Sequence, residues 1–261
     1  MRRRSPRALR AALDAASIPT WTHRPLAGDS TMLAFTQAPG WLAPGRRVYA
    51  VGDVRGDLAA LQAMHTAIRD DLAARPSPHA TLIHLGDVIG ADTRSVGVLA
   101  LLAAPVSGPP IITLRGDHEQ MLLDALDGGA AEATDWWHET GVPVPRDLPA
   151  PHIAFLRGLP NFHREGGYFF AHAGIRPGIP LSRQSAEDLR GIRQAFLSSE
   201  RSFGAVIVHG HSIVPSPVVL PNRIAIDTGS GLRGRLTCAV LEEDRIGFLS
   251  PTHRLLEGAP A

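Results

Sequence analysis

Short apolar runs alternate with longer amphipathic stretches from residue 46 onward, a pattern that is typical of an α/β domain. The apolar runs predict buried strands at residues 48–51, 81–85, 111–114, 168–171, 205–208, 223–226 and 236–241. Apolar residues at helical spacing predict one helix between residues 58 and 72 and another over about 95–104. Residues 128–150 are rich in Gly, Ala and Pro around Trp136 and Trp137, and we expect them to form a flap over one end of the sheet.

Composition narrows the class of protein. The 261 residues are 44% hydrophobic and 20% charged, which provides enough apolar material for one globular domain with a substantial core. No apolar run approaches the roughly 20 residues that cross a bilayer, so we expect no membrane span and no membrane partner. The single cysteine, Cys238, excludes an internal disulfide framework and favours a reducing compartment, so we expect a cytoplasmic protein with Cys238 buried in a strand.

Charge is nearly balanced, with 26 basic residues, all of them arginine, against 25 acidic ones. The resulting net charge of +1 predicts no general attraction to nucleic acid. Arginines are concentrated only at the start of the chain, where no apolar segment typical of a secretory signal accompanies them. We therefore divide the chain into a partly flexible arginine-rich arm, residues 1–45, and a domain, residues 46–261.

Polar residues collect where the predicted strands end. They are Asp53, Asp57, Asp87, Asp117, His118, His172, His209 and His211. Open sheets place their ligand sites beyond strand ends, on loops that the sheet holds in place. Carboxylates and imidazoles suit divalent metals, and a shared carboxylate can bridge two ions about 3.5 to 4 Å apart. Each motif alone is weak, because Gly-Asp after a strand is more often only a turn, but together they predict a metal site.

Three stretches carry a family resemblance: FFAHAGIRPG at 169–178, VHGH at 208–211 and PNRIAIDTG at 221–229. Over about residues 46–245 the chain resembles the calcineurin-like metallophosphoesterases, specifically the bacterial serine/threonine phosphoprotein phosphatases. The resemblance implies a four-layer α-β-β-α sandwich of two mixed sheets around a two-metal centre. There, a bridging hydroxide attacks a phosphate monoester and a histidine protonates the leaving group. It also implies a divalent metal, Mn²⁺ or else Fe or Zn, and a phosphorylated protein or a nucleotide as partner.

Several positions match the functional residues of the family. Those that match metal ligands are Asp53, Asp87, His172 and His211, with Asp87 as the bridging carboxylate. His118 matches the general acid, and Arg193 falls where the pattern has a phosphate-binding arginine. Arg176, just beyond His172, either reaches the phosphate or braces its own loop.

Other positions depart from the family pattern. Arg55 stands where the family has a histidine that binds the first metal, and a guanidinium has no lone pair to offer. Gly90 replaces the aspartate that orients the acid, and Ala91 replaces a phosphate-binding arginine. Asp117 replaces an asparagine ligand, and Gly191 replaces a tryptophan close to Arg193.

The charges of the residues at these positions can balance if one divalent ion is bound. Asp53, Asp87 and Asp117 bring three negative charges, which Arg55 and one divalent ion would neutralise. We expect the Arg55 guanidinium to take the place of the first metal and to pair with Asp53 and Asp87. A single ion would then lie among Asp87, Asp117, His172 and His211. At an effective dielectric near 20, an ion pair at about 4 Å is worth roughly 4 kcal/mol before desolvation, so the replacement is physically tolerable.

The departures from the family pattern remove groups that catalysis would use, and this loss predicts the function. The loss of one Lewis acid, of the carboxylate that orients His118 and of the arginine at position 91 predicts a weak phosphatase that hydrolyses phosphate monoesters through one metal ion. The alternative is a catalytically dead pseudophosphatase that binds a phosphorylated ligand or a partner. We interpret His209 and Asp227 as structural, and Glu119 as a cap of the helix that follows it.

Overall fold

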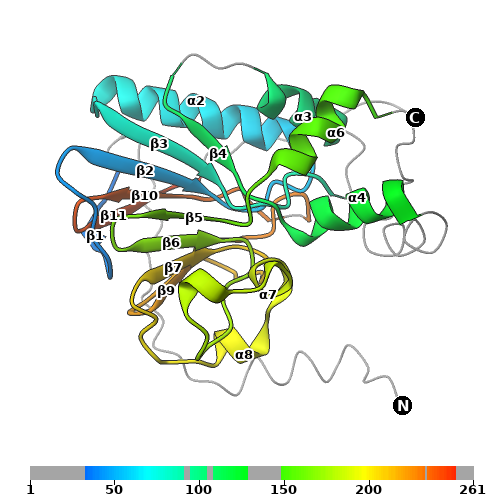
Figure 1. Cartoon of the computed structure of the whole chain (residues 1–261). Helices are drawn as coiled ribbons and strands as arrows, with labels where there is room; N and C mark the ends of the chain where they lie inside the picture. Colours follow the sequence, from blue (N-terminus) through cyan, green and yellow to red (C-terminus); the bar gives the residue numbers. More distant parts are fainter. Residues whose placement is uncertain (1–32, 91–94, 105–107, 129–147, 233, 251–261) are drawn as a thin grey trace. The chain divides into compact units, whose positions relative to one another are not determined.

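Two mixed β-sheets lie face to face and helices cover both outer sides, as the computed structural model shows (Figure 1). The structure describes residues 33–90, 95–104, 108–128, 148–232 and 234–250. The strands of the first sheet run in the order β1-β11-β10-β2-β3-β4. Their bounds are Thr36–Gln37 (β1), Arg245–Leu249 (β11), Cys238–Glu242 (β10), Arg46–Val51 (β2), His79–His84 (β3) and Ile111–Thr113 (β4).

The second sheet has the order β5-β6-β7-β9-β8. Its strands are Phe162–Glu165 (β5), Tyr168–Ala171 (β6), Val206–His209 (β7), Arg223–Ala225 (β9) and Val218–Leu220 (β8). Each sheet contains three adjacent parallel strands, β2-β3-β4 in the first and β6-β7-β9 in the second. Parallel strands end at the same edge of a sheet, so the loops that follow them gather in one place.

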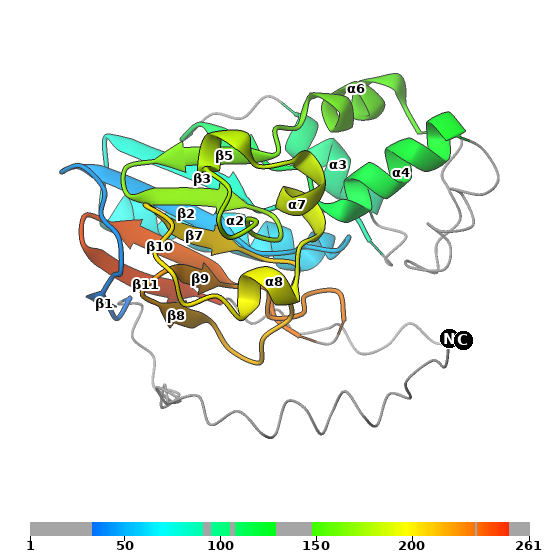
Figure 2. The same ribbon diagram turned by 60° about the horizontal axis from the view of Figure 1, so that its bottom comes forward.

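Side chains along the central strands point alternately to the two faces of each sheet, and they contribute to three apolar clusters. In β2, Tyr49 and Val51 face the helices, whereas Val48 and Ala50 face the other sheet. The helices α2 (Leu58–Ala74), α3 (Ser95–Ala103), α4 (Asp117–Gly128) and α6 (Ala150–Gly158) lie on the first sheet's side. Figure 2 shows α7 (Ala186–Gly191) and α8 (Gln194–Leu197) on the second sheet, where Phe196 packs on β6 and β7. The predicted four-layer sandwich is confirmed.

Every strand predicted from an apolar run is present, with bounds that differ by one to a few residues at either end. The sequence analysis missed β1, β5 and β8, which are short edge strands whose exposed or half-exposed residues carry little apolar signal, and it also missed the inner strand β11. A helix at Glu119 was expected without bounds and is α4, whereas α6 and the short helices near residues 181–197 were missed. The predicted flap falls on residues 129–147, with Trp136 and Trp137, and lies outside the described residues, as does Ala91.

The folded domain begins before residue 46. Thr36 and Gln37 pair with Ile246 and Arg245 of β11, and Leu33 and Phe35 pack against the first apolar cluster. Residues 33–45, which we expected to belong to the arm, are therefore part of the domain, while residues 1–32 lie outside the described part of the chain. No helix in the described ranges combines the length and the apolar character needed to cross a bilayer.

Candidate metal centre

Four predicted ligands converge at the ends of three strands and the start of a helix. Asp87 follows β3, His172 follows β6, His211 lies two residues beyond β7, and Asp117 is the first residue of α4. Each of the four offers one ligand atom, and these atoms all lie within 4.8 Å of one another. Two carboxylate oxygens and two imidazole nitrogens form a donor set that suits a borderline divalent cation such as Mn²⁺, Fe²⁺ or Zn²⁺.

Hydrogen bonds aim the two imidazoles at the same carboxylate. His172 Nδ1 donates to the Leu85 carbonyl at 3.0 Å, which leaves Nε2 facing Asp117 Oδ1 at 2.9 Å and Asp87 Oδ1 at 3.3 Å. His211 Nδ1 lies 3.1 Å from the same Asp117 oxygen. Fixing one ring nitrogen on a backbone carbonyl is how proteins orient a ligating histidine. The residues therefore fit the divalent metal that the family resemblance implies.

Electrostatics at the four residues favour a cation between them. Burial lowers the pKa of His172, but Asp87, Asp53 and Asp117 outweigh burial and raise it to about 10. The pKa of Asp117 is lowered although burial raises it, because His172 and His211 hydrogen-bond to its carboxylate. Without an ion, a proton on His172 partly supplies the positive charge that these carboxylates require.

The Arg55 guanidinium lies between two buried aspartates, one of which, Asp53, the resemblance assigns to the first metal. The guanidinium donates to Asp53 Oδ2 at 2.8 Å and to both carboxylate oxygens of Asp227, at 2.9 and 2.7 Å. All three side chains are buried: 6% of Arg55, 1% of Asp53 and none of Asp227 is exposed. Burial lowers the pKa of Arg55, but the two carboxylates raise it overall, so the guanidinium is a permanent cation.

The expected pairing of Arg55 was right for Asp53 and wrong for Asp87. The second partner is Asp227, which we interpreted as part of a structural turn. Asp227 follows β9 and lies 172 positions along the chain from Arg55, so no local pattern reveals the contact. A bidentate guanidinium–carboxylate pair is geometrically specific, and it brings Asp227 next to Asp53 at the edge of this site.

Two glycines leave room for the Arg55 backbone. A Cβ on Gly90 would lie 2.9 Å from both Cα and Cβ of Arg55, and a Cβ on Gly231 would lie 2.9 Å from Arg55 Cβ. Gly90 is the position where the family has an aspartate. A Cβ there would lie too close to the loop that carries Arg55, and it would do so whichever residue other than glycine stands at position 55.

Three residues of the site adopt left-handed backbone conformations without being glycine. They are Arg55 (φ 47°), Asp87 (φ 46°) and His211 (φ 58°). Such residues cost of order 1–3 kcal/mol each and occur mainly where the surrounding structure fixes a functional side chain. Arg55 shares this feature with two of the converging residues.

His118 keeps an oriented ring in spite of Gly90. Its Nδ1 lies 3.2 Å from the Ile89 carbonyl, which only accepts, so Nδ1 carries a proton. Burial lowers the pKa of His118, but the charges of Asp87 and Asp117 raise it overall. The expectation that the ring loses its orientation with the family's aspartate is therefore wrong, because a backbone carbonyl holds it instead.

Glu119 joins the two loops that carry Asp87 and Asp117. It is fully buried and accepts backbone hydrogen bonds from Asp87 and Gly116, both at 2.8 Å, and from Ile89 at 3.1 Å. The bond from Gly116 caps the start of α4 as predicted. The bonds from the loop after β3 were not predicted, and they fix the spacing between two of the converging carboxylates.

The two arginines predicted to contact phosphate differ in their surroundings. Arg193 lies at the start of α8 with an exposed side chain. The Arg176 guanidinium is exposed and ion-paired with Asp188, at 2.8 Å from Nε to Oδ2. A phosphate at Arg176 would compete with this carboxylate.

Two residues interpreted as structural are packed in the core. His209 is buried with its ring against Phe196, and burial lowers its pKa to about 4. Cys238 is buried in β10 as expected.

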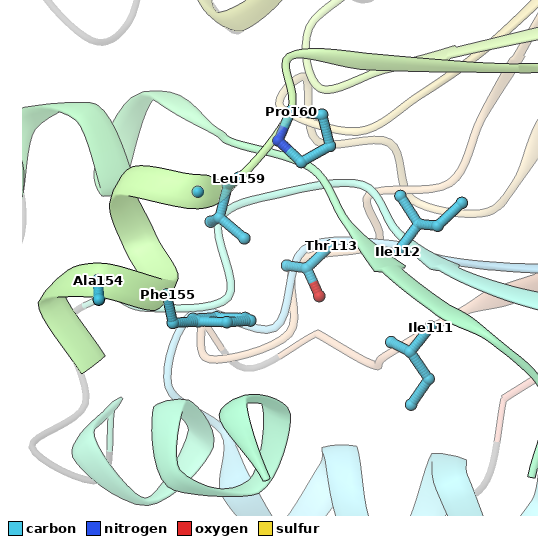
Figure 3. A pocket seen from close by; sticks show the side chains of 8 residues that line it. Ile111, Ile112, Thr113, Ala154, Phe155, Leu159 and Pro160 are labelled. Atoms are coloured by element: carbon cyan, nitrogen blue, oxygen red, sulfur yellow. The ribbon is translucent and has the colours of Figure 1, made fainter. Parts of the chain in front are cut away.

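An open cavity of about 410 Å³ lies between β4 and α6 (Figure 3) and is bordered by Ile111, Phe155 and Pro160. Its lining contains none of the four converging residues, so it is distinct from the candidate centre.

Comparison with known families agrees with this geometry. A family model described as calcineurin-like phosphoesterase matches residues 46–241. A metallophosphoesterase structure from Sphaerobacter thermophilus superposes with a TM-score of 0.52 at 18% identity, over 80% of this chain and 88% of that one. At such identity the structural likeness supports the fold alone.

Two kinds of curated relative match the sequence. A symmetrical bis(5'-nucleosyl)-tetraphosphatase of Methylococcus capsulatus is 32% identical over 131 residues, 50% of this chain and 44% of that protein. Serine/threonine-protein phosphatase 1 of Salmonella typhimurium is 27% identical over 222 residues, 79% of this chain and 95% of that protein. The chain spans less than half the length of the tetraphosphatases that it matches.

Proposed function

Because the chain belongs to the calcineurin-like phosphoesterase family, we propose that it is a weak, phosphatase-like hydrolase that uses one divalent metal ion. The ion, Mn²⁺ in the first place, would be held by Asp87, Asp117, His172 and His211. The convergence of these four ligands, within 4.8 Å of one another, is the observation that carries the proposal. The substrate would be a phosphate monoester on a protein or a nucleotide. The names of the relatives indicate a phosphoprotein in one case and a dinucleoside tetraphosphate, which is a phosphoanhydride, in the other.

Arg55 supports one ion rather than two. Its guanidinium occupies the side of the site formed by Asp53 and Asp227, and it cannot be deprotonated to make room for a metal. Four carboxylates, including Asp87 and Asp117, face one guanidinium and one divalent ion, which leaves a single negative charge. An imidazolium at His118 balances that charge and provides a proton for a leaving group.

Catalysis in this arrangement depends on the ion and on His118. A bound divalent ion polarises a phosphoryl oxygen and lowers the pKa of water. His118 Nδ1 is fixed on the Ile89 carbonyl, so in the protonated ring Nε2–H is the second donor, and protonation of a leaving alkoxide is worth about 10²- to 10⁴-fold. Arg193 is the proposed phosphate contact. Arg176 keeps that role only where a phosphate displaces Asp188.

One observation favours the rival function, a pseudophosphatase that binds phosphorylated ligands without turnover. The ion pairs of Arg55 are buried and complete, so the site provides only one Lewis acid to activate and align a nucleophile. The ligand set would still bind a phosphate through the ion. The two functions share the metal and differ in turnover.

A metal titration together with a kinetic comparison distinguishes the weak hydrolase from the pseudophosphatase. Chelator-treated protein is titrated with Mn²⁺ by calorimetry, and hydrolysis of an aryl and an alkyl phosphate is then followed with the wild type and His118→Gln. We expect one ion per chain and an alkyl phosphate rate at least about 100-fold lower in His118→Gln. The aryl phosphate rate should fall less, because a phenolate leaves without a general acid. The matched control is His79→Gln, an exposed histidine at the opposite end of β3.

Each outcome of these measurements decides between the hydrolase, the pseudophosphatase and a site of another kind. Two ions per chain would overturn the one-metal site, and the absence of binding at millimolar Mn²⁺ would overturn the metal centre itself. One ion with no hydrolysis of either substrate would establish the pseudophosphatase.

A further inference from the structure

Two arginines beside the candidate metal centre have only neutral hydrogen-bond partners among the described residues. Arg190 Nη1 donates to the side-chain oxygen of Asn161 at 2.8 Å. Arg115 donates to the Gln120 amide oxygen at 3.1 Å and to the carbonyls of Leu156 and Arg157 at 3.1 and 2.7 Å. By contrast, many other arginines pair with carboxylates, as Arg46, Arg47, Arg55, Arg75 and Arg176 do.

The backbone places both arginines at the edge of the centre. Phe162 of β5 pairs with Ala171 of β6 in antiparallel register, so Asn161, the partner of Arg190, lies across from His172. The backbone of α7 is also tied to this strand end, because Ala173 N–H donates to the Leu189 carbonyl at 2.8 Å.

Arg115 approaches the same loop from the other side. It precedes Asp117 by two residues, and its backbone N–H donates to the Pro160 carbonyl at 2.8 Å, next to Asn161. The segment at residues 160–161 therefore lies between the two arginines. Both side chains are only partly buried, so a ligand can reach them from solvent.

The two guanidinium groups act on each other as like charges. Burial and the charge of Arg115 lower the pKa of Arg190, while Asp124 and Asp117 work in the opposite direction. A guanidinium held by neutral acceptors keeps its charge. Both Nη2 hydrogens of Arg115 go to carbonyls of α6 and its Nε is buried, so Arg115 contributes mainly charge. Arg190 makes one bond, to Asn161, among the described residues and has further N–H donors for phosphate oxygens. The arrangement thus provides two cations next to a site that would hold a phosphate on a metal ion.

We propose that Arg115 and Arg190 form a subsite for a second phosphate group, so that the preferred ligand is a phosphoanhydride such as a nucleoside polyphosphate. The inference rests on the proposed function, because the first phosphate is taken to bind at Asp87, Asp117, His172 and His211. The subsite distinguishes a polyphosphate chain from a phosphate monoester with one anionic group. An acidic phosphopeptide is the competing ligand, and the experiment below separates the two.

Calorimetry with inorganic anions tests the subsite without relying on turnover. Full-length protein saturated with Mn²⁺ is titrated with inorganic phosphate, then with inorganic pyrophosphate, in the wild type, Arg190→Gln and Arg190→Lys. We expect the wild type to bind pyrophosphate at least about 10-fold more tightly than phosphate, which corresponds to about 1.4 kcal/mol. In Arg190→Gln this preference should fall to near one while the Kd for phosphate stays unchanged, and Arg190→Lys should restore part of it.

The control is Arg69→Gln, which removes the same charge from the exposed face of α2 and should keep the wild-type preference. A preference that survives in Arg190→Gln overturns the subsite, and so does an equal loss of affinity for both anions. Tighter binding of a doubly acidic phosphopeptide than of pyrophosphate overturns the ligand class. If the wild type binds phosphate without preferring pyrophosphate, only the subsite fails. If it binds neither anion, the proposed function fails as well.

Discussion

The two halves of the candidate centre hold similar carboxylates in different ways. In the first half, Asp53 and Asp227 enclose Arg55, and the three side chains are almost completely buried. In the second half, Asp87 and Asp117 face two imidazoles, and 32% of the Asp117 side chain is exposed. The first half carries its own cation within the chain, whereas the second half can accept one from solvent.

This difference is the one expected if a guanidinium has replaced a metal ion in the first half, as we propose. Buried carboxylates at strand ends need a counter-charge, and a guanidinium supplies one along with fixed hydrogen-bond geometry. Because Arg55 is covalently part of the loop after β2, the first half has a counter-charge within the chain. The second half keeps the exposure that a ligand requires.

The largest expected effect comes from removing the internal cation. Arg55→Leu leaves the carboxylates of Asp53 and Asp227 buried without the cation that pairs with them, so we expect the free energy of unfolding to fall by about 3–5 kcal/mol. Urea denaturation at pH 7 measures it. The control is Arg46→Leu, which breaks the ion pair with Glu165 at a side chain that is 39% exposed and should cost less than about 1 kcal/mol. Equal losses in the two variants would contradict the division of the centre into halves.

A smaller effect is expected at the glycine that accommodates Arg55. Gly90→Ala places a Cβ 2.9 Å from Arg55 Cα and Cβ, and we expect a loss of about 1–3 kcal/mol in the free energy of unfolding. Gly191→Ala is the matched control, because a Cβ at the end of α7 meets nothing within 4 Å. It should leave stability unchanged or raise it by up to about 1 kcal/mol. If Gly90→Ala is as harmless as Gly191→Ala, then Gly90 and Arg55 are not sterically linked.

The sequence predicts the second half of the centre better than the first. Asp87, Asp117, His172 and His211 follow or precede elements with a clear apolar pattern, so their convergence could be inferred from the strand ends. The pairing of Arg55 with Asp227 could not, because a Gly-rich turn after a short strand looks the same whether its aspartate caps the turn or binds a distant cation.

Backbone acceptors are a second class of feature that the sequence hides. The Ile89 carbonyl orients His118, and the neutral partners of Arg115 are carbonyls at the end of α6. Every residue type carries a carbonyl, so no side-chain motif marks these contacts. The same reason explains why the replacement of the family's aspartate by Gly90 suggested a disordered acid, whereas the structure holds the ring in place.

The smallest expected effect lies at the link between the loops of the second half. Glu119→Gln keeps the shape of the side chain but turns one acceptor oxygen into a donor that faces a backbone N–H. Burial raises the pKa of Glu119 to about 7, with a further contribution from Asp87, so its negative charge itself adds little stability. We therefore expect a loss of only about 1 kcal/mol in the free energy of unfolding, the net value of one hydrogen bond.

Metal affinity should respond more than stability to the same change. Residues that orient metal ligands typically contribute about 10- to 100-fold to affinity, so we expect Mn²⁺ to bind Glu119→Gln about 10-fold more weakly in a calorimetric titration. Glu165→Gln, a partly buried acidic residue paired with Arg46, is the control and should leave Mn²⁺ affinity unchanged. Arg55→Leu should not weaken Mn²⁺ binding, because it removes a positive charge that faces the same carboxylates. An unaltered Mn²⁺ affinity in Glu119→Gln would mean that the spacing of Asp87 and Asp117 is set by the strands alone.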